Sequence, residues 1–155
     1  MENKEKQVID SEAADQILKQ YIVVRFNKEQ FGISINYIQN IVRMTSITRV
    51  PNVPDYIKGV INLRGEIIPI MSLRIKLDLE PDEITNQTRI IIVNVDDKLV
   101  GLFVDEVMEV LILEDEQIEK QTKEGTDKKS KYISGVGKLE DRLISLFNVE
   151  QIIAD

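Results

Sequence analysis

The sequence contains no cysteine, no histidine and no tryptophan. It therefore cannot form a disulfide, it offers no thiol or imidazole nucleophile, and it lacks the usual ligands of zinc. Glycine accounts for only seven of the 155 residues, and neither a glycine-rich phosphate loop nor a calcium-loop pattern occurs. We accordingly expect no cofactor and no metal ion.

The chain also lacks clustered positive charge and long apolar runs. Its formal net charge is -7, and Lys128, Lys129 and Lys131 form the only dense basic cluster, which argues against nucleic-acid binding. No apolar run approaches the roughly 18 residues that a membrane helix needs, and the N-terminal MENKEKQVIDSE is too polar for a signal peptide. We expect a cytoplasmic protein without direct membrane insertion.

Apolar residues make up 43% of the chain, and from Tyr21 onward they form short β-like runs joined by turn residues. These runs predict four hairpins: YIVVRF with FGISI, GVINL with IIPIMSL, TRIIIVNV with LVGLFV, and ISGVGKL with RLISLF. Short helices are expected in SLRIKLDL and NVEQIIAD. The spacing of Ile35, Ile38, Ile41 and Val42 predicts about two turns of helix. Residues 1–18 are expected to be a tail, with Asp10 or Ser11 able to cap a short helix.

The second half of the chain repeats the first. FGISINYIQNI aligns with VGLFVDEVMEV, and GVINLRGEIIPI aligns with GVGKLEDRLISL. We place the repeats at about 19–82 and 83–147, followed by a C-terminal helix at 148–155, and assign the longer spacing in the second repeat to a surface loop at 122–131. Each repeat is too small to bury its apolar surface alone, so we expect some apolar faces to pack between the repeats or against a partner.

The repeats differ at one hairpin turn. Arg64 stands opposite Glu140 in the alignment, so the unit does not need an arginine at that corner in order to fold. This makes Arg64 a candidate contact residue. Carboxylates such as Asp96 and Asp97 are plentiful, but neighbours in sequence near turns are more typical of solvated surface than of an acid–base pair.

Three blocks, PDYIKGVINLRGEIIPIMSL, VGLFVDEVMEVL and YISGVGKLEDRLISLFNVEQI, resemble the CheW family of bacterial chemotaxis adaptors from Tyr21 to the C-terminus. The resemblance implies a mainly β fold of two intertwined, five-stranded, SH3-like barrels with short helices. It also implies a non-enzymatic role in signal transduction, coupling methyl-accepting chemotaxis receptors to the histidine kinase CheA in receptor arrays. The alternatives are a CheW-like scaffold of another receptor–kinase pathway and, in a different class, a small β-barrel ligand carrier or carboxylate hydrolase.

The resemblance also implies two sets of contact residues. The receptor tip lies in the groove between the barrels, which on this chain implies receptor contacts at Ile35, Ile38, Lys58, Arg64 and Val107. The regulatory domain of the kinase meets the barrel ends, which implies kinase contacts at Val50, Ile57 and Gly59. The family often has an acidic residue where this chain has Asn40 and an Asp where it has Ser72. The missing carboxylate at Asn40 would weaken one charge contact with the receptor or leave Arg64 with a different partner.

Overall fold

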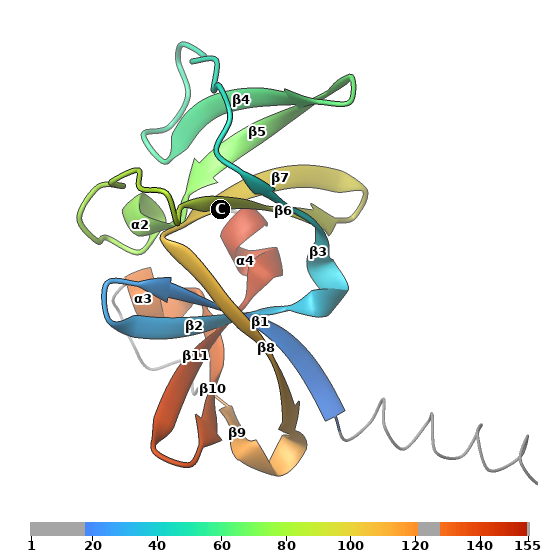
Figure 1. The fold of residues 1–155 in the computed structure, drawn as a ribbon, viewed down its shortest axis with the longest axis vertical. Helices are drawn as coiled ribbons and strands as arrows, with labels where there is room; N and C mark the ends of the chain where they lie inside the picture. Colours follow the sequence, from blue (N-terminus) through green and yellow to red (C-terminus); the bar gives the residue numbers. More distant parts are fainter. Residues whose placement is uncertain (1–17, 121–127, 155) are drawn as a thin grey trace, which may run out of the picture.

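The computed structural model describes residues 18–120 and 128–154 (Figure 1). In chain order the strands are β1 (Leu18–Phe26), β2 (Glu29–Ser34), β3 (Ile38–Arg43), β4 (Ile57–Leu63), β5 (Glu66–Ser72), β6 (Arg89–Val95), β7 (Lys98–Val104), β8 (Glu106–Glu114), β9 (Ile118–Lys120), β10 (Ile133–Leu139) and β11 (Arg142–Phe147). The helical segments are η1 (Ile35–Tyr37), α2 (Leu73–Lys76), η2 (Asp115–Gln117), α3 (Lys128–Lys131) and α4 (Val149–Ala154).

The strands form two sheets, which confirms the predicted mainly β fold. One sheet has the order β8-β1-β2-β11-β10-β9 and the other the order β3-β6-β7-β5-β4. The five-stranded sheet closes because Thr48, in the segment after β3, exchanges two backbone hydrogen bonds of 2.8 Å with Val60 of β4. In the other sheet a sixth, three-residue strand, β9, follows the opposite edge strand β8 through η2.

All four predicted hairpins are present, as β1–β2, β4–β5, β6–β7 and β10–β11. The β6–β7 and β4–β5 connections are two-residue turns with both central residues at positive φ: Asp96 at 52° and Asp97 at 64°, Arg64 at 53° and Gly65 at 87°. Such turns match the right-handed twist of the paired strands. The helices expected after β5 and near the C-terminus are α2 and α4.

The helix expected over residues 35–42 is wrong. Only Ile35–Tyr37 is helical, and β3 begins at Ile38. The apolar spacing was misleading because Gln39 is bulged out of the β3–β6 ladder, which places Ile38 and Ile41 on one face of a strand although they are three residues apart. The short helix expected in the N-terminal tail lies outside the described residues, and of the loop expected at 122–131 the structure describes Lys128–Lys131, which is helical.

Residues that the two predicted repeats align have matching positions in the sheets. The aligned glycines occupy equivalent places: Gly32 of β2 pairs with Leu146 of β11, and Gly101 of β7 pairs with Ile70 of β5, in the two parallel ladders. A Cβ on Gly32 would lie 2.8 Å from the Leu146 side chain, and a Cβ on Gly101 would lie 2.5 Å from that of Ile70. Only glycine allows this close approach of a neighbouring side chain at either site.

Neither repeat forms a sheet of its own. The six-stranded sheet combines the first hairpin of the first repeat, β1–β2, with β8 to β11 of the second. The five-stranded sheet combines the first hairpin of the second repeat, β6–β7, with β3 to β5 of the first. The boundary expected near residue 82 lies between α2 and β6, and the segments before and after it each contribute strands to both sheets.

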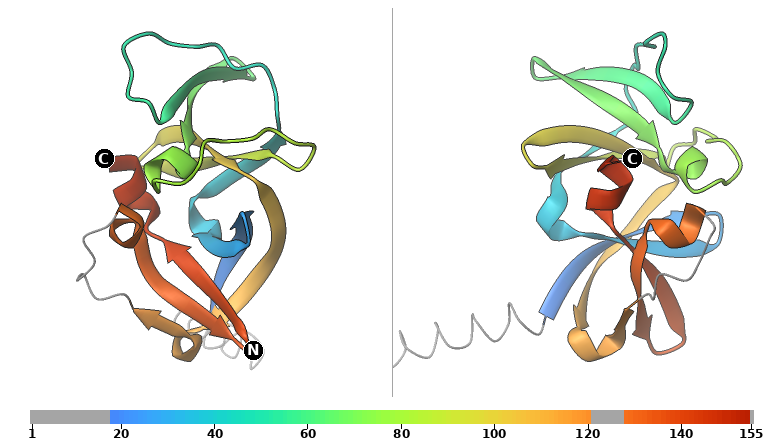
Figure 2. Two further views of the ribbon diagram at one scale, coloured as in Figure 1. Left: turned by 90° about the vertical axis from the view of Figure 1, so that its left-hand side faces the viewer. Right: turned by 180° about the vertical axis from the view of Figure 1, so that it is seen from behind.

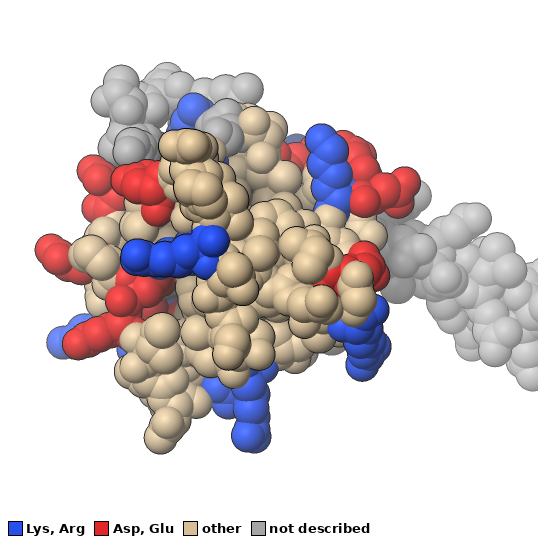
Figure 3. Space-filling model, turned by 90° about the horizontal axis from the view of Figure 1, so that it is seen from above, with Lys and Arg blue, Asp and Glu red and all other residues tan. Residues whose placement is uncertain are grey.

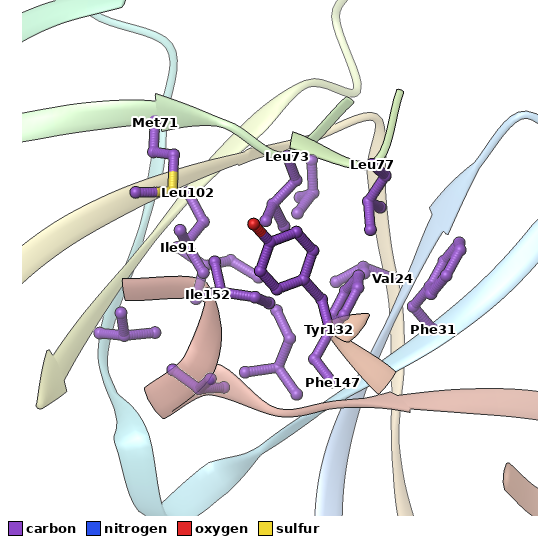
Figure 4. Packing of buried hydrophobic residues seen from close by; sticks show 14 of the residues in the cluster. Val24, Phe31, Met71, Leu73, Leu77, Ile91, Leu102, Tyr132, Phe147 and Ile152 are labelled. Atoms are coloured by element: carbon purple, nitrogen blue, oxygen red, sulfur yellow. The ribbon is translucent and has the colours of Figure 1, made fainter. Parts of the chain in front are cut away.

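The largest apolar core lies between the two sheets (Figure 4). It contains 19 buried residues among those described, whereas the clusters inside the five-stranded and six-stranded sheets contain six and four. In Figure 4, Met71, Ile91 and Leu102 of one sheet face Val24 and Phe147 of the other, with Leu73 and Ile152 from the helices between them. The expected packing of apolar faces between the repeats is confirmed, and it dominates the hydrophobic stabilisation of the fold.

Candidate functional site

The chain crosses between the sheets at two equivalent places. The first crossing is η1, between β2 and β3, where the Asn36 backbone N–H donates to the Ser34 hydroxyl at 3.3 Å. The second crossing lies between β7 and β8, at Asp105. Ile38 and Val107 follow these crossings and pack, half-buried, against the core between the sheets. Together with Ile35 in η1, three of the five predicted receptor contacts therefore lie at the crossings.

Two exposed residues extend the same apolar faces into solvent. Ile41 of β3 is 41% exposed and lies opposite the core residue Ile91, and Val110 of β8 is 53% exposed and lies opposite the core residue Ile22. Directly opposed residues of an antiparallel pair share a face of the sheet. The face between the sheets therefore continues past the buried core along both β3 and β8, which are edge strands.

We call the exposed and half-buried apolar residues at these places the inter-sheet apolar surface; its residues are Ile35, Ile38, Ile41, Val107, Val110 and Ile112. Sequence reasoning missed Ile41, Val110 and Ile112 because apolar residues at regular spacing were assigned to the core. The alignment contained the useful signal, since Ile41 and Val110 are equivalent residues on the strands that end each sheet. Exposed aliphatic residues beside the core between two sheets are typical of a docking site for another protein.

Arg64 lies at the tip of the β4–β5 turn, where its φ of 53° is left-handed. Its counterpart Glu140 has a φ of 56°, so this corner requires the backbone geometry but not the positive charge. The turn is held by the Gly65 N–H, which donates to the Asn62 side chain at 3.0 Å. Arg64 is exposed, and within residues 18–120 and 128–154 no hydrogen bond or ion pair engages its guanidinium. Its five donors are therefore available to a partner.

Lys58, unlike Arg64, forms an ion pair within the chain, with Asp82. It is bulged out of the β4–β5 ladder, and its Nζ lies 3.9 Å from Asp82, which also accepts a hydrogen bond from the Ser72 hydroxyl. The Ser72 oxygen in turn caps α2 by accepting from the Ile75 N–H at 3.2 Å. Asp82, in the loop after α2, thus places a negative charge beside both Ser72 and Lys58.

The predicted kinase contacts lie at the end of the five-stranded sheet that Figure 3 views from above. The centre of this view is largely uncharged, with separate Lys and Arg side chains around it and acidic side chains on two sides of it. Val50, 37% exposed, and the half-buried Ile57 line a hollow of about 490 Å³ together with Arg49, Pro51, Val53, Pro54, Asp55 and Lys58. Gly59 is buried beneath this surface and affects it through the backbone of β4.

The adjacent carboxylates after β7 are held in ion pairs. Asp105 accepts from both Arg74 Nε, at 2.8 Å, and Arg74 Nη2, and Glu106 accepts from Arg25 at 2.6 Å. Burial raises the pKa of Asp105, but hydrogen bonds from Arg74 and the Asn27 N–H, with the charges of Arg74 and Arg25, outweigh it and hold the pKa below its ordinary value. A general acid needs the opposite shift, so this pair gives a hydrolase no support.

Two further results concern the described residues alone. No group of three or more acidic side chains there is arranged to hold a metal ion. No described helix is long and apolar enough to cross a membrane.

Comparison with known proteins identifies the family. The CheW-like domain family matches residues 20–155. The chemotaxis protein CheW of Bacillus subtilis is 38% identical over 133 residues, covering 85% of each chain, and that of Helicobacter pylori is 34% identical over 134 residues, covering 86% of this chain and 81% of that protein. The crystal structure of the scaffolding protein TtCheW from Thermoanaerobacter tengcongensis matches with a TM-score of 0.78 at 32% identity, covering 84% of this chain and 88% of that one. The chain therefore belongs to the CheW-like domain family.

Proposed function

We propose that this protein is a non-enzymatic adaptor that couples methyl-accepting chemotaxis receptors to the histidine kinase CheA, in the cytoplasm at receptor arrays. The observation that carries the proposal is the inter-sheet apolar surface, which leaves aliphatic side chains of both sheets open to solvent in a chain of this family. It is a surface for protein binding, and no catalytic constellation accompanies it among the described residues.

The surface suits a receptor tip built from two helices. An amphipathic helix binds by laying apolar side chains, spaced three or four residues apart, into a hydrophobic groove. Ile38 and Ile41 on one sheet and Val107 and Val110 on the other supply the apolar side of such a contact. Arg64, at the β4–β5 turn, supplies a cation that donates to a carboxylate or to backbone carbonyls of the tip.

The hollow beside β4 suits the second partner. Its lining mixes the apolar side chains of Val50, Val53 and Ile57 with the charges of Arg49 and Asp55. A mixed apolar and polar surface is typical of protein interfaces, so the hollow at this end of the barrel is the site that would bind the regulatory domain of the kinase.

Reconstitution tests the function directly. Kinase autophosphorylation is measured with receptor fragments and CheA, in the presence and absence of this protein. We expect the protein to raise kinase activity only when receptor is present. Equal activity with and without the protein would contradict the adaptor role.

Val110→Asp is expected to lower the retention of receptor cytoplasmic fragments about tenfold or more, because it places a charge on the apolar contact surface without disturbing a buried residue. The measurement is a pull-down at several receptor concentrations. Leu143→Asp is the matched control, since Leu143 is 64% exposed on β11 of the same sheet but lies near the turn of the β10–β11 hairpin. Equal losses for both variants would refute a role for the inter-sheet apolar surface.

Arg64→Glu is expected to abolish receptor coupling while leaving the fold intact, because the exposed side chain has no described partner and the turn tolerates glutamate at the equivalent Glu140. Receptor pull-down and circular dichroism measure the two effects. Glu140→Arg reverses the charge at the equivalent corner of the other sheet and is expected to retain receptor. Undiminished binding by Arg64→Glu would remove Arg64 from the receptor contact.

A further inference from the structure

The two helices α2 and α4, which follow β5 and β11, lie near each other (Figure 2), and a hydrogen bond from Lys76 to the Ile152 carbonyl joins them. At the first crossing, the Tyr37 hydroxyl donates to Glu150 of α4 at 2.8 Å. At the second crossing, Asp105 is paired with Arg74 of α2. A side-chain contact thus joins each crossing to the helix that ends the other repeat. A displacement of the first crossing acts on α4, and a displacement of the second acts on α2.

The contacts at the two crossings differ in strength. Asp105 receives two hydrogen bonds from Arg74 and one from the Asn27 N–H, and the side chain of Arg74 is only 8% exposed. The tie at η1 is a single hydrogen bond at the surface, from Tyr37 to Glu150. Moving the first crossing therefore costs less than moving the second. The bond to Glu150 raises the pKa of Tyr37 further above neutral pH, where the phenol is protonated and donates in any case.

Lys76 connects the two helices. Its Nζ donates to the Ile152 carbonyl of α4 at 2.9 Å, and the side chain is only 4% exposed. The same ammonium lies over two aromatic rings, 4.4 Å from the centroid of Tyr56 and 5.1 Å from that of Tyr132. A desolvated cation between two rings is held in a narrow range of positions. Displacement of α4 therefore acts on both tyrosines through Lys76.

Tyr56 carries the connection to the kinase side. It directly precedes β4, and its carbonyl accepts from the Ser72 N–H at 2.7 Å. The next residue, Ile57, lines the hollow assigned to the kinase. Direct contacts therefore lead from η1, which presents Ile35 to the receptor, through α4, Lys76 and Tyr56 to the hollow.

We propose that Tyr37 and Lys76 are positioning residues that link occupation of the inter-sheet apolar surface to the shape of the hollow beside β4. A receptor tip that contacts Ile35 shifts η1, Tyr37 transmits the shift to α4, and Lys76 transmits it to Tyr56. This inference rests on the proposed function and adds to it a physical route between the two partners. A linkage of this kind is measured as a coupling between two binding equilibria.

The test is the affinity of the full chain for the isolated regulatory domain of CheA, measured with and without a saturating receptor fragment. For the wild type we expect the two dissociation constants to differ, and their ratio is the coupling. Tyr37→Phe removes one hydroxyl and is expected to move the ratio about threefold or more toward one, while the affinity for each partner alone changes less than twofold. Tyr21→Phe, which removes the hydroxyl of another half-buried tyrosine in β1, is the control and is expected to keep the wild-type ratio.

A double variant identifies the bond responsible. If Tyr37 acts through Glu150, then Tyr37→Phe combined with Glu150→Ala changes the ratio no more than either substitution alone. Lys76→Met, which keeps the aliphatic chain, is expected to lower the coupling in the same direction. A wild-type ratio of one, a ratio unchanged by Tyr37→Phe, or additive effects in the double variant would each overturn the linkage while leaving the adaptor role intact. Failure of the wild type to bind either partner would instead overturn the adaptor role, and the linkage with it.

Discussion

Asp105→Asn is expected to destabilise the protein by about 2 kcal/mol at neutral pH, because it removes the carboxylate from a partly buried, doubly hydrogen-bonded ion pair with Arg74. The Arg74 guanidinium keeps two weaker acceptors, the Asn27 side chain at 2.8 Å and the Glu80 carbonyl at 3.1 Å, but it loses its counter-charge. The pair also joins α2 of the first repeat to the second crossing, so the loss weakens the contact between the sheets. Urea unfolding of wild type and variant measures the difference.

The same pair predicts how the effect depends on pH. Because the folded-state pKa of Asp105 lies below its ordinary value, ionised Asp105 contributes stability above an ordinary aspartate pKa of about 3.9, and this contribution is lost as the pH falls through the folded-state value. The stability difference between wild type and Asp105→Asn is therefore expected to be full at pH 7 and to shrink toward pH 3. Asp141→Asn, at an exposed turn, is the control and is expected to change stability by less than about 0.5 kcal/mol. A gap that stayed constant with pH would show that the charge of Asp105 is not responsible.

Gly59→Ala is expected to destabilise the protein by about 4 kcal/mol. Gly59 has a φ of 144°, a backbone conformation that residues with a side chain rarely adopt. A Cβ there would collide with the backbone carbonyl oxygen of Thr48. Thr48 and Val60 form the bridge that closes the five-stranded sheet, so the collision cannot be relieved by rotating a side chain. The expected loss of kinase docking would follow from distortion of β4. Thermal unfolding and kinase binding are measured on the same samples.

Gly65→Ala separates strain from collision. Gly65 also has a positive φ, 87°, but nothing lies within 4 Å of a Cβ built there. Its substitution is expected to cost only about 1 to 2 kcal/mol, the strain of a left-handed backbone. If Gly59→Ala proved as stable as the wild type and still lost kinase binding, Gly59 would be a direct contact of the kinase. The prediction that Gly59 acts through the backbone of β4 would then be wrong.

Local sequence patterns predicted where the strands lie along the chain, but they did not predict which strands pair across the repeats. Short apolar runs and the turn residues between them indicated the four hairpins because both signals lie within a few residues of each other. The pairing of β2 with β11 and of β5 with β7 joins residues of different repeats, and the same local pattern would suit a repeat that closed on itself. Packing of the core between the sheets favours pairing between the repeats, and this packing depends on the whole chain.

The candidate site was predicted in part for a similar reason. Arg64 could be singled out because the repeats disagree at an exposed corner. Ile41 and Val110 agree between the repeats and so resembled core residues, but both lie on edge strands, where no further strand covers them. Periodicity reports which residues share a face of a strand, and only the assembled sheets show where that face meets solvent.

The exchange of hairpins between the repeats has an evolutionary consequence. Two separate copies of a single repeat could build this pair of barrels only as a symmetric dimer in which each subunit lends its first hairpin to the other. In such a dimer every surface would occur twice, and a change at one corner would appear at both. Fusion into one polypeptide frees equivalent corners to diverge, as Arg64 and Glu140 have done. A single chain can thus offer unlike surfaces to unlike partners, which a symmetric ancestor could not do.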